Sequence, residues 1–272
     1  MKEQEARNPS NLRHFFETVY VLAVMDLKLK YQNSFIGFLW SFIRPFLQFL
    51  VYFSIFGVLL KISKEQDYAL ALFYGVLVWA WFSEGTSLGM NSFIGKRSIL
   101  TKVNVNKCVP PFAAFLTPTI NYGINFCIFL FAFVLFGHTS WHFILTWGHL
   151  FLFVYSLLGI ALLINTWNII LANLNVLFRD VQQIWELILT YGVFLTPVIY
   201  TLPIPKKYEV LYYSLNLLAY PLQNLKSIFF TSQPSRFADI NITLGYLSAM
   251  VFWLLIALFI HYKLSKRVVD FL

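Results

Sequence analysis

The chain has few charged residues, and this scarcity excludes an ordinary water-soluble domain. Only 12% of its 272 residues are Asp, Glu, Lys or Arg, against about 25% in soluble domains. Hydrophobic residues make up 59% of the chain, and the mean hydropathy is +0.68. Since a membrane-spanning helix needs about 20 apolar residues, the composition predicts an all-α integral membrane protein with several spans.

Cysteine and catalytic motifs are also scarce. Cys108 and Cys127 form no CxxC motif and allow at most one disulfide. The stretch 89–97 resembles a phosphate-binding loop only superficially, because five residues separate its glycines and no strand precedes it. His138 and His142 have metal-like spacing, but an aromatic loop at the membrane interface explains them better as polar anchors. We therefore expect no metal site, no cofactor and no enzymatic activity on this chain.

The sequence predicts six spans, which are separated by polar loops. Residues 1–35 form an N-terminal segment, in which the pattern of 11–31 predicts an amphipathic helix lying in the membrane interface. A cytosolic helix packed on a partner is the alternative for that segment. Residues 36–272 form one transmembrane domain. Four prolines interrupt 202–241, which predicts re-entrant or interfacial helices before the last span. The six predicted spans cover about 38–60, 68–89, 111–136, 150–174, 184–200 and 242–262.

The basic residues lie beside the apolar segments and predict the orientation of the chain. On the side that holds both termini, Lys and Arg number five before the first span, four in 94–108, Arg179, and three after the last span. The opposite loops hold six. The excess predicts cytoplasmic termini. Positive-inside topology and anionic lipid account for the net charge of +8, so we expect membrane lipids and no nucleic acid as partners.

The first span contains an arginine within its apolar run. Residues 45–60 alone are too few to cross comfortably, so the span begins near Phe38 and Arg44 lies inside the membrane. A charge there suggests a function. Glu84 lies near the end of the second span at a similar depth of roughly 9 Å. We therefore predict an ion pair between Arg44 and Glu84, with separate extension of both side chains to the headgroups as the alternative.

Three motifs in sequence order carry a resemblance to a known family. The first joins Leu29-Lys30-Tyr31 to the residues 33–37 and Trp40, the second is the basic loop that ends in Pro110, and the third joins 177–181 to 196–200. Together they resemble type-2 ABC exporter permeases for polysaccharides. The chain departs from that family at Asn216-Leu217, where Asn-Pro is usual, and at Lys226, where arginine is common.

The resemblance implies a half-transporter in the bacterial cytoplasmic (inner) membrane. Two copies of the chain would form the conduit, and two separate ATPase subunits would hold ATP and Mg. The substrate would be a lipid-linked polysaccharide such as O-antigen, capsule or teichoic acid. Two inward turns would contact the ATPase, with attraction to lipid headgroups as the alternative role of their charges. The candidate coupling residues are Lys96, Arg97, Lys102, Lys107, Arg179 and Asp180.

A glycan conduit needs aromatic platforms together with polar partners for sugar hydroxyls. On the first span, six phenylalanines from Phe38 to Phe56 share one face, whereas Trp40, Arg44 and Gln48 share the opposite face. Phenylalanine offers no hydroxyl partner, so we expect the phenylalanine face to contact lipid or other helices. The candidate substrate-pathway residues are Trp40, Gln48 and Tyr52, with Tyr191 and Phe194 of the fifth span.

Two other classes remain open from the sequence. A secondary transporter or channel would also show broken helices and an intramembrane charge, but it would usually show an internal repeat, and none is visible. A membrane-embedded glycosyltransferase would need acidic residues clustered in an aqueous loop, and here they are scattered.

Overall fold

The computed structural model describes residues 12–32, 37–62, 67–102, 106–136, 146–200, 204–230 and 235–265. Every regular element in these ranges is a helix. Some residues singled out in the sequence lie outside the described ranges, namely 33–36, His138 and His142.

Five helical segments in the described ranges are long and apolar enough to cross a membrane, which confirms an all-α integral membrane protein. The first, Gly37–Leu59, is one continuous segment that contains three types of helix. The other four are α4 (Tyr68–Met90), α7 (Val109–Phe136), α8 (Trp147–Leu177) and α12 (Ile240–Leu264).

The predicted fifth span corresponds to a shorter helix that starts and ends earlier. α9 (Asp180–Leu195) has 16 residues, or roughly 24 Å at 1.5 Å per residue. It contacts both α4 and α8. The helix ends before Thr196, whose backbone is extended, because Pro197 disfavours a helical conformation of the residue before it. The count of six spans stays a prediction.

The first span changes its helical type along its length. It begins with the 3₁₀ turn η1 (Gly37–Leu39), continues as α3 (Trp40–Tyr52), and ends as the π-helix η2 (Phe53–Leu59). Its phenylalanines pack on α4, with the rings of Phe46 and Phe49 centred 6.2 and 5.2 Å from that of Phe73. This packing leaves the opposite face of α3 free to line a polar space.

α4 is the central helix, and it contacts α3, α7, α8, α9 and α11. Its glycines allow α8 to approach closely, as small residues do between membrane helices. A Cβ atom at Gly89 would lie 2.0 Å from the Asn168 side chain. The end of α8 is further tied to the end of α4, because Asn175 Nδ2 donates to the Met90 carbonyl at 3.3 Å.

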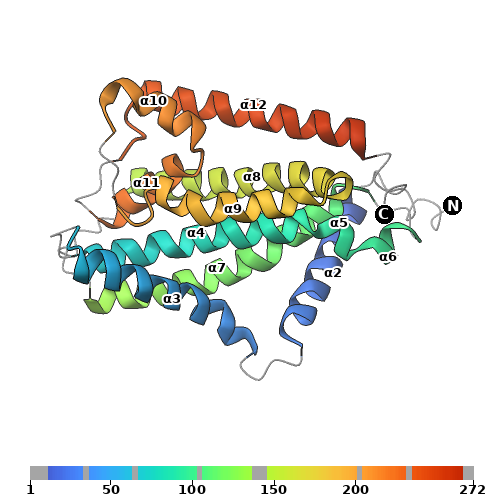
Figure 1. Cartoon of the computed structure of the whole chain (residues 1–272), viewed down its shortest axis with the longest axis horizontal. Coiled ribbons are helices and arrows are strands. Elements are labelled where there is room, and N and C mark those ends of the chain that lie inside the picture. The colour runs from blue at the N-terminus through green and yellow to red at the C-terminus, as the bar shows by residue number, and fades with distance from the viewer. Residues whose placement is uncertain are drawn as a thin grey trace.

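The two ends of the bundle carry different short elements (Figure 1). At the end where α12 finishes lie α5 (Ser92–Gly95) and α6 (Arg97–Leu100). At the opposite end lie α10 (Lys206–Leu215) and α11 (Ala219–Phe229). At about 15 and 17 Å these last two helices are too short to cross a bilayer. Short helices were expected between α9 and α12, and their depth in the membrane stays a prediction.

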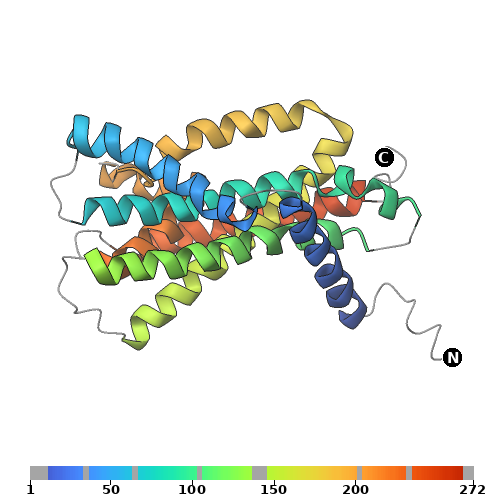
Figure 2. The same ribbon diagram turned by 90° about the horizontal axis from the view of Figure 1, so that it is seen from below.

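The N-terminal helix α2 (Leu12–Tyr31) leaves the bundle at an angle (Figure 2). Val19 and Leu22 pack against Val109 and Ala113 at the start of α7. Other apolar side chains of α2 stay exposed, namely Phe16, Tyr20, Val21, Met25 and Leu29. A tilted helix with an uncovered apolar face fits the predicted position in the membrane interface.

Candidate conduit and coupling sites

A polar cavity of about 940 Å³ lies between α3, α4, α7 and α9, beside the C-terminal end of α2. Hydroxyl, amide and charged side chains line much of it. Most of them belong to spanning helices, where such groups are energetically costly and usually mark a functional site. The polar lining residues are Lys30, Ser41, Arg44, Gln48, Ser83, Glu84, Ser87, Asn121, Asn125, Glu186 and Thr190.

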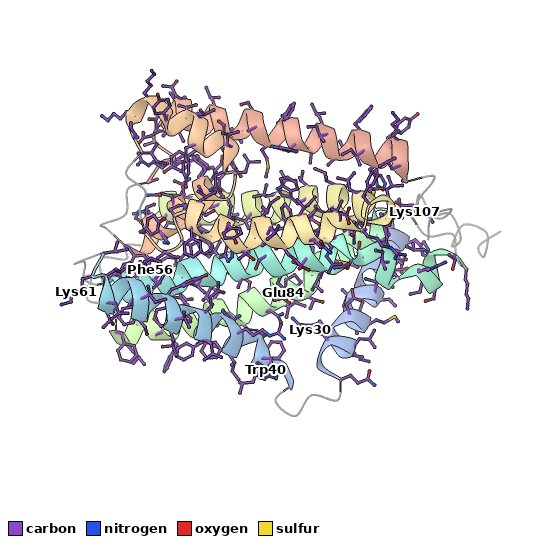
Figure 3. The ribbon with its side chains drawn as sticks, viewed as in Figure 1. Lys30, Trp40, Phe56, Lys61, Glu84 and Lys107 are labelled. Atoms are coloured by element: carbon purple, nitrogen blue, oxygen red, sulfur yellow. The ribbon has the colours of Figure 1, made fainter. Side chains whose placement is uncertain are left out.

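Glu84 is held in this cavity by two partners, and Arg44 is not one of them. Lys30 forms an ion pair with Glu84 Oε1, and Asn121 Nδ2 donates to the same oxygen at 3.1 Å. The structure therefore corrects the predicted Arg44–Glu84 pair. The physical reason is that α2 ends beside the bundle at the level of Glu84, so that Lys30 reaches the carboxylate first (Figure 3).

Arg44 lies on the wall of the same cavity and is exposed. Among the described residues it forms no ion pair within 4 Å. The predicted depth of Arg44 relative to the membrane is not tested by this arrangement.

α9 contributes a polar face that does not suit contact with lipid tails. Gln182, Gln183, Glu186 and Thr190 are exposed, and Gln182 Nε2 donates to Glu186 Oε1 at 3.0 Å. Glu186 and Thr190 line the cavity. In Figure 2, α9 and α3 lie along the same edge of the bundle, so their polar faces border one space.

The structure brings four of the five predicted substrate-pathway residues into one neighbourhood. Trp40 and Gln48 line the cavity. Gln48 Nε2 donates to the Tyr52 hydroxyl at 3.0 Å, and the Tyr52 ring is centred 6.3 Å from that of Phe194. Tyr191 is exposed on α9 and does not line the cavity. Their role in transport stays a prediction.

The sequence reasoning missed the amides of α7. Asn121 and Asn125 line the cavity, and Asn125 Nδ2 donates to the Ser41 carbonyl of α3 at 3.0 Å. Two asparagines spaced four residues apart lie on one helix face, in a span that is otherwise strongly apolar. That spacing could have identified a polar face on this span from the sequence.

The predicted coupling residues belong to the segments at the end of the bundle where α5 and α6 lie (Figure 1). Arg97, Lys102, Arg179 and Asp180 are exposed. Lys107 is partly buried, and this burial lowers the pKa of its amine. Lys96 differs from the rest, because it is only 8% exposed and its Nζ lies 2.7 Å from Asp26 Oδ2 of α2. Lys96 therefore joins α2 to the loop after α4.

Spanning helices around a polar cavity are typical of a multi-pass membrane transport protein. The ABC-2 type transporter family matches residues 17–230, and the chain belongs to this family. It is thus a transport subunit rather than an enzyme, and the family implies an ABC ATPase as its partner. The predicted recognition as a type-2 ABC permease is confirmed.

Curated relatives describe the particular kind of permease. The chain is 34% identical over 181 residues to the O-antigen export system permease protein RfbA of Myxococcus xanthus, covering 66% of this chain and 67% of the relative. Two Klebsiella pneumoniae proteins with the same description are 28% and 27% identical over 209 and 205 residues. Each of these matches covers 73% of this chain and 75% of the relative.

Proposed function

We propose that this chain is the membrane subunit of an ABC exporter that moves a lipid-linked polysaccharide of the O-antigen type across the bacterial cytoplasmic membrane. The cavity between α3 and α9 carries this proposal, because it combines an aromatic platform with amide, hydroxyl and charged groups. Trp40 is 39% exposed and offers a ring face to sugar C–H groups. The substrate named for the relatives supports the same class.

We also propose that two copies assemble with two ATPase subunits, which bind ATP and Mg. The polar face of α9 supports the dimer, since Gln183 is exposed outside the cavity and would otherwise contact hydrocarbon. Facing copies would enclose both cavities in a shared aqueous path. The chain itself then needs no cofactor.

The orientation follows from the basic residues and the position of the short helices. With α5, α6 and the α8–α9 turn in the cytoplasm, the exposed side chains of Arg97, Lys102 and Asp180 would meet the ATPase. Both termini would be cytoplasmic, and α10 and α11 would lie at the outer face.

Purification of the tagged chain from its native host tests the assembly. We expect the ATPase to copurify, and the mass of the complex by light scattering to equal two copies of each subunit. A secondary transporter or a glycosyltransferase would be recovered without an ATPase, and that result would contradict the proposal.

A matched pair of variants tests the conduit. Trp40→Ala removes the exposed ring of the cavity, and we expect polysaccharide export to fall at least tenfold while the ATPase still copurifies. The control is Phe259→Ala, which removes an aromatic side chain that is 65% exposed on α12. Export that is equally impaired in both variants would indicate a general loss of folding instead.

A further inference from the structure

Arg44 is a cation on the wall of a cavity whose two carboxylates, Glu84 and Glu186, form no ion pair with it. Glu84 is held by Lys30 and Asn121. Glu186 accepts a hydrogen bond from the Gln182 amide. It forms no ion pair with Arg44 within 4 Å. At the membrane depth predicted for the first span, a guanidinium favours a compensating anion, since a charge there is otherwise expensive.

The surroundings of Arg44 are suited to a tetrahedral anion. The guanidinium presents a planar fork of N–H donors that binds phosphate oxygens in pairs. Ser41 lies one turn earlier on the same face of α3, and its hydroxyl has no partner among the described residues. Both residues line the cavity, whereas the charge of Lys30 is already compensated by Glu84.

We propose that Arg44 binds the phosphate group of a membrane-anchored ligand, with Ser41 as a second donor. The cavity lies beside the end of α2, the helix expected in the membrane interface, which is the level of lipid phosphates. Two sources supply this chemistry, namely the phosphate that joins a glycan to its lipid carrier and the headgroup of a bilayer phospholipid. The assignment to the glycan carrier rests on the proposed function.

Binding to the purified permease–ATPase complex tests the proposal without requiring transport. Native mass spectrometry of the complex in detergent would count bound polyprenyl phosphate, and separately bound phosphatidylglycerol, over a titration of each lipid. We expect Arg44→Gln to weaken polyprenyl phosphate binding at least tenfold and Arg44→Lys to weaken it less. The matched control is Lys61→Gln, which removes one exposed cation from the other end of the same span.

The two lipids distinguish the source of the phosphate. Weakening confined to polyprenyl phosphate supports the glycan carrier, whereas equal weakening for phosphatidylglycerol supports a general phospholipid site at Arg44. Unchanged binding of both lipids by Arg44→Gln would overturn the proposal, provided that its melting temperature and ATPase content match the wild type. A Lys61→Gln variant that loses binding equally would also overturn it, because charge alone would then account for the affinity.

The results that would contradict the proposed function differ from those that would contradict the phosphate site. If the wild-type complex contains no ATPase or exports no polysaccharide, the transport assignment is wrong, whatever lipid Arg44 binds. If Arg44→Gln blocks export while lipid binding is intact, the transport assignment stands and the phosphate site does not.

Discussion

Glu84 shows how a single carboxylate on the wall of the polar cavity can tie three helices together. It accepts from Lys30 of α2 and from Asn121 of α7 while it belongs to α4. The Lys30 and Glu84 side chains are 28% and 31% exposed, so solvent screens their attraction only in part. The pair is therefore a measurable contributor to the position of α2.

A double-mutant cycle tests this pair. We expect Lys30→Ala and Glu84→Ala each to lower the melting temperature, with a coupling energy of about 1 kcal/mol between them, the upper end for partly exposed pairs. The cycle of Arg44→Ala with Glu84→Ala serves as the control and should be additive. Strong coupling in the control would restore the ion pair predicted from the sequence.

Asp180 is the residue at which coupling to the ATPase can be tested most directly. It opens α9 directly after the α8–α9 turn and is exposed. We expect Asp180→Lys to abolish export while the amount of inserted protein stays unchanged, as measured by export assay and membrane blotting. Lys102→Glu reverses an exposed charge in the other turn and provides the comparison. Normal export by Asp180→Lys would refute a coupling role for Asp180.

The candidate site was only partly predictable at the scale of single residues. Trp40, Arg44 and Gln48 were found because they share one face of a helix whose other face is phenylalanine. The partner of Glu84 was not found, because hydropathy places residues by depth along a span and says nothing about where the interface helix α2 ends.

At the scale of elements, a buried lysine holds the turn that follows α9. Lys226 of α11 is 5% exposed, and its Nζ donates to the carbonyls of Pro197 and Val198 at 2.7 and 2.8 Å. Gly75 of α4 lies against this contact, where a Cβ atom would be 2.8 Å from the Val198 oxygen. α4, α9 and α11 therefore meet at one polar point in an apolar core.

Replacing this lysine should destabilise the end of the bundle that carries α10 and α11. Lys226→Met leaves two buried carbonyls without these donors, and each such loss costs about 1–3 kcal/mol. Relief of the buried charge offsets part of that cost, so we expect a net loss of about 1–3 kcal/mol in thermal unfolding of the purified protein. Lys226→Arg keeps the charge and donors and should lose less. A Met variant as stable as the wild type would contradict this account.

The burial of α11 predicts a pattern of chemical accessibility. In a chain whose two cysteines are changed to serine, we expect a cysteine at Leu222 to react poorly with a membrane-impermeant thiol reagent. Cysteines at Lys206 and Ser235 should react well, because both residues are exposed whereas Leu222 is fully buried. Uniform labelling would indicate a solvated loop in place of packed helices.

The boundaries of most elements were close to those read from the sequence. α4 and α12 begin and end within two residues of the predicted spans, because long apolar runs bounded by polar residues define a helix by themselves. α11 was harder to interpret, since its apolar run is short and contains Pro221. Its burial comes from contacts with α4 and α8, which are remote in sequence.

At the scale of the whole molecule, the two ends differ in charge and in shape. The end where α12 finishes carries α5, α6 and the exposed Arg97 and Lys102, whereas the other end carries α10 and α11 with the exposed Lys206 and Lys207. Over the whole sequence, Lys and Arg number 13 on the first side and six on the second. This asymmetry predicts the orientation in the membrane.

Labelling of intact cells tests the orientation. In the chain without native cysteines, a cysteine at Lys207 should react with an impermeant reagent, because it would face outward. A cysteine at Lys102 should react only after the membrane is permeabilised. Both positions are exposed, so a difference between them reports sidedness, and the opposite pattern would reverse the topology.

The length of α8 has a mechanical consequence. Its 31 residues extend for about 46 Å, well beyond a hydrocarbon layer of ~30 Å. It contains no proline, whereas α3 and α7 contain Pro45 and Pro118. Its far end is fastened to the end of α4 through Asn175. A force applied at the turn before Asp180 would therefore meet a stiff lever, which carries displacement into the span rather than absorbing it by bending.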